Sequence, residues 1–240
     1  MNIGVIFAGG VGMRMHTRGI PKQFLKVNGK PIIVHTVEIF ENTSEIDAVV
    51  VVVPNDSMPL MANLVSKFNL SKVRNIVSGG NTGQLSIFSG LKAAKKMSNS
   101  EKDIVIIHDG VRPLINGDVI NNNIQSVKEK GSAITVAPAK ETLIIVNNDQ
   151  KIESVLARDK SRIAKAPQSF YLHEILDIEE KAIASGKNNF VDSSTLMAFY
   201  GKKLFTVEGP YENIKITTPD DFYMFKALFD ARENAQIFGI

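Results

Sequence analysis

Residues 2–15 have the sequence NIGVIFAGGVGMRM, and this stretch decides the fold class. Its first part, residues 3–7, is a short apolar run rich in β-branched side chains, typical of a strand buried on both faces of a parallel sheet. Gly9, Gly10 and Gly12 follow directly. Because ligands bind beyond the carboxyl ends of the strands in open parallel sheets, we expect a binding site at this loop.

The glycine loop is suited to binding phosphate. Glycines let the backbone approach a ligand closely and leave N–H groups free to surround it, and Arg14 adds a fixed positive charge. Neither common nucleotide fingerprint fits, because Met15 stands where the dinucleotide motif needs glycine and no Gly-Lys-Ser/Thr follows. From the glycines alone, a tight turn without a ligand stays an open alternative. Lys22 could bring a second cation to the same phosphates.

Strands and helices alternate along the rest of the chain. Further buried strands are predicted at residues 48–53 and 104–107, with weaker ones at 73–77, 133–136 and 204–207. Helical periodicity occurs at residues 32–40, 58–68, 84–96 and 118–128, from about 172, and after 218. This order predicts an α/β fold, a Rossmann-like and mostly parallel twisted sheet with helices on both faces.

A hairpin interrupts this alternation. Residues 143–146 and 152–156 are short strand candidates on either side of the turn sequence NNDQ at 147–150. They predict a protruding β-hairpin arm over residues 139–159. An isolated hairpin is only marginally stable in water, so we expect the arm to dock on another surface, such as a second subunit.

Composition favours one globular domain over residues 1–240 and excludes several classes of function. The chain has 44% hydrophobic residues, a formal net charge of +3 and no Cys, so disulfides and thiolate chemistry are excluded. The charge is too small, and too scattered, to indicate a nucleic-acid partner. The longest apolar run, residues 48–53, is too short to span a membrane, and no targeting leader precedes the first strand. We therefore expect a cytoplasmic protein with no membrane partner.

Four segments together resemble the cytidylyltransferases that act on 2-C-methyl-D-erythritol 4-phosphate or ribitol 5-phosphate. They are AGGVGMRM at 8–15 with PKQFL at 21–25, HDGVRP at 108–113, APQSF at 166–170 and ENIKIT at 212–217. The resemblance covers essentially the whole chain. It implies a nucleotidyltransferase that moves a cytidylyl group from CTP to a sugar-alcohol phosphate and releases pyrophosphate. The partners would be these two small molecules and a second copy of the chain.

The resemblance also assigns site residues. Nucleotide-binding positions would be Ala8, Gly9, Gly10, Gly12, Gly80, Asn81, Ser86, Asp109 and Gly110. Charge stabilisation during the transfer would fall to Arg14, Lys22, Arg158 and Lys215. Acceptor-binding positions would be Arg112, Thr142, Arg158 and Lys215. The cofactor would be Mg²⁺ with Asp109 as its protein ligand, since magnesium binds through one or two carboxylates and substrate phosphates.

Three further features are assigned roles: the arm, His108 and a C-terminal aromatic group. By resemblance, the arm crosses to a partner subunit in a homodimer, and this carries Thr142 and Arg158 to the partner's site. His108 is expected to serve packing or hydrogen bonding, because attack by an ionised phosphate needs no general base. An aromatic group near the C-terminus is expected to belong to the core or the dimer interface: Phe222, Tyr223, Phe225 and Phe229.

Departures from the family pattern leave the acceptor open. Asn81 and Gly83 stand where an acidic residue and an arginine are usual, and Ala166 replaces a threonine. Val111 favours ribitol 5-phosphate and thus a CDP-alditol for teichoic acid or capsule biosynthesis. The alternatives are methylerythritol phosphate in isoprenoid biosynthesis, a sugar-1-phosphate nucleotidyltransferase using UTP or GTP, and, in a different class, a non-catalytic nucleotide-sugar sensor.

Overall fold

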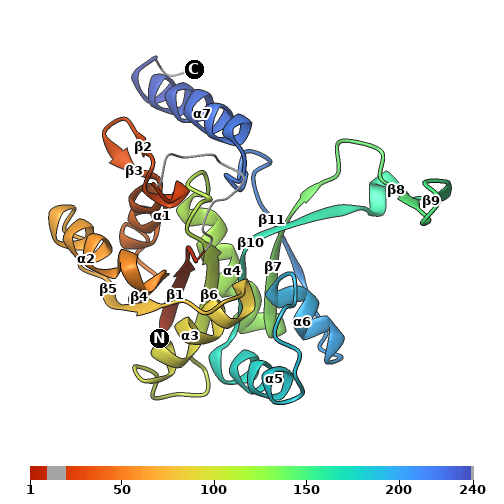
Figure 1. The fold of residues 1–240 in the computed structure, drawn as a ribbon, viewed down its shortest axis with the longest axis horizontal. Helices are drawn as coiled ribbons and strands as arrows, with labels where there is room; N and C mark the ends of the chain where they lie inside the picture. Colours follow the sequence, from red (N-terminus) through yellow and green to blue (C-terminus); the bar gives the residue numbers. More distant parts are fainter. Residues whose placement is uncertain (10–19, 239–240) are drawn as a thin grey trace.

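A computed structural model describes residues 1–9 and 20–238. Its main sheet has seven strands in the order β11-β7-β10-β6-β1-β4-β5 (Figure 1). The strands of this sheet are β1 (Asn2–Phe7), β4 (Ala48–Val53), β5 (Val73–Ser78), β6 (Ile104–Asp109), β7 (Ser132–Pro138), β10 (Arg162–Tyr171) and β11 (Thr206–Glu208). The helices are α1 (Ile32–Glu41), α2 (Met58–Lys67), α3 (Gly83–Lys95), α4 (Gly117–Lys130), α5 (Leu172–Ala184), α6 (Ser193–Phe199) and α7 (Pro219–Phe238).

Strand β1 lies at the centre, as its apolar sequence predicts. It pairs in parallel with β4 on one side and β6 on the other, and β4 pairs in parallel with β5. Every residue of β4 and β6 is buried, which explains why apolar residues run along β4 without alternation. The predicted α/β class with a mostly parallel sheet is confirmed. The sheet's topological switch lies at β1, where β4 and β6 diverge to opposite sides.

Strand β10 was not predicted from the sequence. It runs antiparallel to both β6 and β7, between them. Its sequence RIAKAPQSFY contains no continuous apolar run, and Pro167 has no N–H to donate to a ladder. The pairing with β7 accordingly shifts register between Ala164 and Gln168. Helix α6 was missed for a simpler reason, since its seven residues are too few to show a helical period.

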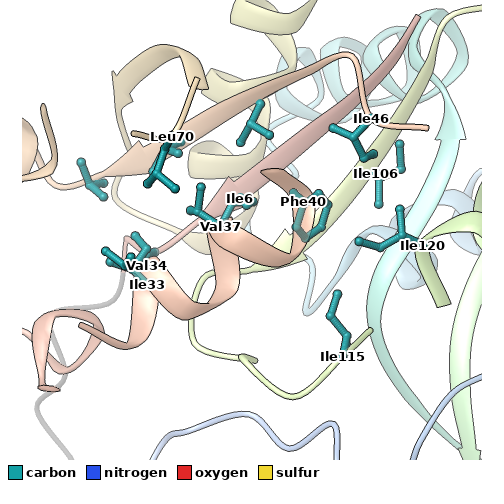
Figure 2. Close-up of a cluster of buried hydrophobic side chains, with 14 of the residues drawn as sticks. Ile6, Ile33, Val34, Val37, Phe40, Ile46, Leu70, Ile106, Ile115 and Ile120 are labelled. Carbon is teal, nitrogen blue, oxygen red and sulfur yellow. The ribbon is translucent and has the colours of Figure 1, made fainter. Parts of the chain in front are cut away.

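Two hydrophobic layers enclose the sheet. Helices α1, α2 and α4 cover one face, and helices α3, α5 and α6 cover the other. Figure 2 shows part of the first layer, where the labelled α1 side chains Ile33, Val34, Val37 and Phe40 lie against the sheet. Polar caps set where several helices begin: Thr82 for α3, Asn116 for α4 and Asp192 for α6.

Helix α7 packs on a third, smaller apolar cluster. Phe225 is fully buried there, and Phe222 and Phe229 pack around it, so the core role predicted for these aromatic residues is confirmed. Tyr223 differs, being 69% exposed. The predicted start of the helix is also correct, because the Thr218 side chain accepts a hydrogen bond from the Asp221 N–H at 3.4 Å.

The hairpin arm projects from the body of the molecule (Figure 1). Its strands β8 (Ile144–Val146) and β9 (Ile152–Val155) pair only with each other. Every residue of both strands is exposed, and the arm bears several exposed apolar side chains: Ile144, Ile145, Val146, Ile152, Val155 and Leu156. Such an apolar surface on a two-stranded ribbon is typical of an interaction site.

No helix within the described residues has both the length and the apolar composition needed to cross a bilayer.

Phe40 is the side chain on which the layer beneath β1 depends. It is fully buried, and a Cβ added at Gly4 would lie 2.7 Å from its ring. We expect Phe40→Ala to lower the free energy of unfolding by about 3–5 kcal/mol, as for other large-to-small core substitutions. Leu60→Ala on α2 is the control, since Leu60 is 46% exposed and its loss should cost within about 0.5 kcal/mol. Urea denaturation of both variants provides the measurement; equal losses would contradict the packing described here.

Candidate active site

Two adjoining cavities lie where the carboxyl ends of β1, β5 and β6 meet. The first has a volume of about 320 Å³ and the second about 260 Å³. They share four lining residues: Phe7, Gly83, Asp109 and Lys215. The first cavity is also lined by Ala8, Gly9, Lys22, Gln23, Gly80, Asn81, Thr82, Ser86, Val111 and Thr217. The second is also lined by Ile87, Ile107, Arg112, Ala164, Lys165, Ala166, Gln168, Val191, Asp192 and Ser193.

Asp109, the last residue of β6, sits at the junction of the cavities. One carboxylate oxygen lies 2.6 Å from Lys215 Nζ, and the other accepts a hydrogen bond from Arg112 Nε at 2.8 Å. Burial alone would raise the pKa of Asp109, but the Lys215 ammonium and the Arg112 guanidinium outweigh it and lower the pKa to about 2. The carboxylate is therefore ionised at neutral pH and fixes the positions of two cations.

The loop between β5 and α3 forms a tightly packed wall of the first cavity. Ser86 is 1% exposed, and its hydroxyl accepts a hydrogen bond from the Gly80 N–H at 3.2 Å and lies 2.9 Å from the Thr82 carbonyl oxygen. A Cβ placed on either Gly9 or Gly79 would lie 2.8 Å from this hydroxyl. Small residues are thus required here for steric reasons, and they leave backbone groups facing the cavity.

Gln23 is a cavity residue that the sequence interpretation passed over, although it lies within the quoted PKQFL segment. Its side chain is fully buried and donates a hydrogen bond from Nε2 to the Ala8 carbonyl oxygen at 2.9 Å. Within the described residues, its Oε1 atom has no hydrogen-bond partner. Gln23 therefore fixes the backbone at the end of β1, next to the glycine loop.

Some, but not all, of the predicted nucleotide-binding residues line the first cavity. Ala8, Gly9, Gly80, Asn81, Ser86 and Asp109 all line the first cavity, as does Lys22. Gly110 lines neither cavity. Its N–H donates to the Phe7 carbonyl at 2.9 Å, and its own carbonyl accepts from the Thr36 hydroxyl at 3.1 Å. The role of Gly110 in nucleotide binding stays a prediction, and in this structure both of its backbone groups are bonded within the protein. Predictions for Gly10, Gly12 and Arg14 lie outside the described residues.

Polar groups from several segments line the second cavity. Gln168 donates from Nε2 to the Asp192 carboxylate at 3.1 Å, and Asp192 also caps α6 by accepting from the Thr195 N–H at 2.8 Å. Burial would raise the pKa of Asp192, but the bonds from Thr195 outweigh it and lower the pKa. Neither Gln168 nor Lys165 was predicted to bind substrate, because their strand was itself not predicted.

Two predicted residues of the arm lie apart from the cavities. Arg158 and Thr142 are both exposed and are joined by a 3.4 Å contact between Arg158 Nη2 and the Thr142 hydroxyl. Neither residue lines either cavity of its own chain. The structure therefore does not bring them to Arg112 and Lys215 within one chain.

His108 is buried below the junction. One ring nitrogen, Nε2, lies 3.1 Å from the Arg112 carbonyl oxygen. Burial lowers the pKa of His108 to about 4, so the ring is neutral near pH 7. Since it lines neither cavity, it supports the Asp109 turn by packing and hydrogen bonding.

The capacity of the site for a metal ion is limited. The described part of the chain contains no group of three or more His, Asp or Glu side chains placed to hold a metal. Asp109 is the single carboxylate on the described wall of the first cavity, and both of its oxygens are already paired with cations. A Mg²⁺ ion fits here only if phosphate oxygens supply most of its ligands, which is the usual mode of Mg²⁺ at nucleotides.

Comparison with known proteins agrees with this arrangement. The family model described as IspD, 2-C-methyl-D-erythritol 4-phosphate cytidylyltransferase, matches residues 3–231. The ribitol-5-phosphate cytidylyltransferase of Streptococcus agalactiae serotype Ia is 65% identical over 240 residues, covering 100% of both chains. The 2-C-methyl-D-erythritol 4-phosphate cytidylyltransferase of Clostridium botulinum strain Langeland is 34% identical over 226 residues, covering 94% of this chain and 96% of that one.

A solved structure gives the same fold. The crystal structure of 4-diphosphocytidyl-2C-methyl-D-erythritol synthase from Anaerococcus prevotii has a TM-score of 0.82 and 28% identity, covering 95% of this chain and 96% of that one. The likeness thus extends over the whole sheet and both of its helical layers. The protein is a member of the 2-C-methyl-D-erythritol 4-phosphate cytidylyltransferase family of nucleotidyltransferases.

Proposed function

We propose that the enzyme transfers CMP from CTP to ribitol 5-phosphate, giving CDP-ribitol and pyrophosphate. The observation that carries this proposal is the pair of cavities that share the Asp109–Lys215 ion pair. A nucleotide in the first cavity and an acceptor in the second would meet at this pair. The 65% identity to a ribitol-5-phosphate cytidylyltransferase, against 34% to a methylerythritol enzyme, supports ribitol as the acceptor alcohol.

The transfer needs no covalent help from the protein. A phosphate oxygen of the acceptor attacks the α-phosphorus of CTP, a new P–O bond forms, and the bond to the bridging oxygen of the leaving pyrophosphate breaks. Negative charge grows on the phosphoryl oxygens and the leaving group, and positioned cations stabilise that charge. Lys215 lies at the junction, Lys22 lines the nucleotide cavity, and the family signature adds Arg14.

The nucleotide cavity suits a pyrimidine better than a purine. Its wall around Gly80 and Ser86 is built from small residues and backbone, whose N–H and carbonyl groups suit one pyrimidine edge. We infer that backbone groups of the 79–83 loop and Ala8 bind the cytosine edge. Mg²⁺, when bound to the triphosphate, would neutralise charge on the β- and γ-phosphates, with Asp109 contributing at most one oxygen.

The active unit is proposed to be a homodimer with shared sites. The arm exposes six large apolar side chains, and its Arg158 lines neither cavity of its own chain. Docking on a partner would bury that apolar surface and add Arg158 and Thr142 to the partner's acceptor cavity. We expect the dimer to work in the cytoplasm, where CTP and sugar-alcohol phosphates are made.

The proposed reaction is tested by measuring pyrophosphate release with each of the four nucleoside triphosphates and a panel of acceptors. We expect CTP with ribitol 5-phosphate to give the highest kcat/KM, with Mg²⁺ required. The panel includes 2-C-methyl-D-erythritol 4-phosphate, glycerol 3-phosphate and a hexitol phosphate. A preference for methylerythritol phosphate would reassign the enzyme to isoprenoid synthesis, and CTP binding without turnover of any acceptor would favour a sensor.

A shared site predicts complementation between two inactive variants. Lys215→Met and Arg158→Met should each lower kcat at least about a hundredfold, as expected for loss of a charge that stabilises the transition state. When the two variants are co-expressed, each mixed dimer contains one intact site. We therefore expect recovery of about a quarter of wild-type activity for random pairing in a twofold dimer.

The matched control for this experiment is Lys151→Met, which changes an exposed charge at the arm tip and should leave kcat unchanged. A co-expressed pair that stays as inactive as either parent would show that Arg158 serves its own chain or no site at all.

The pH dependence of the reaction should follow the acceptor and not Asp109 or His108. The pKa of Asp109 is lowered to about 2 and that of His108 to about 4. Both groups therefore keep nearly the same charge from pH 5 to pH 8, and neither should cause a change of rate in that range. We expect kcat/KM to fall below about pH 6, where the acceptor phosphate passes from the dianion to the singly protonated monoanion. The phosphonate analogue, whose second pKa is higher, should move this limb upward. An unmoved limb would assign it to a protein group.

A further inference from the structure

We propose that Lys165 donates a hydrogen bond to a hydroxyl group of the acceptor and is a specificity-determining residue of the second cavity. The inference rests on the proposed function, since it takes a sugar-alcohol phosphate to be seated there. It assigns a role to a buried cation that the reaction described above does not use.

The backbone places Lys165 in the cavity wall. It lies in β10 between Ala164 and Ala166, and all three residues line the second cavity. The ladder between β10 and β7 is interrupted from Ala164 to Gln168, so this segment departs from regular pairing on that side. Lys165 is 8% exposed, which is unusual for a lysine.

The ammonium group of Lys165 is incompletely satisfied by the protein. Its Nζ donates to the carbonyl oxygens of Tyr211 at 3.0 Å and Asn213 at 3.1 Å. An ammonium has three donors. Within the described residues, Lys165 has no third hydrogen bond and no carboxylate within ion-pair distance. Besides these two bonds, Nζ lies 5.3 Å from the centre of the Tyr211 ring, and its third donor has no hydrogen-bond acceptor among the described residues, so a ligand oxygen in the cavity can take it.

Electrostatics around Lys165 favour an oxygen ligand. Burial and then the nearby Arg112 guanidinium lower the pKa of Lys165, because a buried cation beside another cation is poorly stabilised. A ligand oxygen that accepts the third hydrogen bond of the ammonium would offset part of the free energy that its burial costs. The small apolar neighbours Ala164 and Ala166 offer no such oxygen from their side chains.

The position of Lys165 indicates which part of the acceptor it would contact. Asp109 and Lys215 line both cavities, whereas Lys165 and Arg112 line only the second. The acceptor phosphate must lie at the shared boundary in order to reach the nucleotide. Its carbon chain then extends into the second cavity, toward Lys165. A hydroxyl oxygen of that chain, and not the phosphate, is therefore the group that meets the remaining donor.

The test compares wild type and Lys165→Met on ribitol 5-phosphate and on analogues that each lack one hydroxyl group. We expect Lys165→Met to lower kcat/KM for ribitol 5-phosphate by about 10- to 100-fold, the range of one hydrogen bond from a charged donor. For the analogue that lacks the contacted hydroxyl, the two enzymes should differ less than about twofold. Affinity for CTP, measured by calorimetry, should stay unchanged.

Lys140→Met is the matched control. Lys140 Nζ lies 3.7 Å from the centre of the Tyr211 ring, which Lys165 also approaches at 5.3 Å, but Lys140 is exposed and lines neither cavity. It should leave kcat/KM unchanged for every acceptor. Lys165→Gln, which keeps a donor without the charge, is the second variant should Lys165→Met fail to fold. It should show a smaller loss with the same dependence on the missing hydroxyl.

An equal loss for every acceptor would overturn the inference, because Lys165 would then act only by holding the carbonyls of Tyr211 and Asn213. That outcome leaves the proposed function intact. A wild-type enzyme that turns over none of these alditol phosphates would instead refute the proposed function and the inference together.

Discussion

The site depends on the buried Asp109 carboxylate and its two cations. Asp109 ends a central strand, Arg112 belongs to the turn that follows, and Lys215 comes from a segment about a hundred residues later in the chain. The ion pair with Lys215 therefore joins the carboxyl end of β6 to the segment that precedes α7. Because a buried carboxylate is costly unless it is paired, folding selects the arrangement in which both cations face it. The same arrangement places Lys215 at the boundary between the two cavities.

The sheet gives that carboxylate a rigid support. β6 is buried along its whole length, and Phe40 packs beneath it with its ring 5.5 Å from the ring of His108. On the side of β6 away from β1, strand β10 runs antiparallel to it, and its irregular segment from Ala164 to Gln168 reaches the second cavity. The parallel half of the sheet thus supplies the first cavity, for which we propose the nucleotide, and the antiparallel strand supplies much of the second, for which we propose the acceptor. These roles follow from topology, since only strand ends and irregular segments expose polar groups at a sheet edge.

The sequence was most informative about features that depend on residues close together in the chain. The apolar strands and the capped start of α7 were predicted because each depends on a few neighbouring residues. Asp109, Arg112 and Lys215 were linked through family motifs, and the structure brings them within hydrogen-bond distance. Lys165 could not be found this way, because its burial arises from β10 and a loop near residue 211 folding together. The bond between the Gly110 carbonyl and Thr36 on α1 could not be found this way either, because it joins residues 74 positions apart.

The division into two cavities separates the chemistry of the reaction from the choice of acceptor. One wall of the first cavity is closely packed, because a Cβ at Gly9 or Gly79 would meet the Ser86 hydroxyl at 2.8 Å, so substitutions at these glycines disturb the fold. The second cavity is lined by side chains from β10 and the start of α6, including Lys165, Gln168 and Ser193. Within the described part of the chain, Gln168 and Ser193 form no hydrogen bond with Asp109 or Lys215, whereas Lys165 shares the Asn213 carbonyl with Arg112. A fold of this kind can keep one transfer reaction while its second cavity adapts to alcohols of different length and branching.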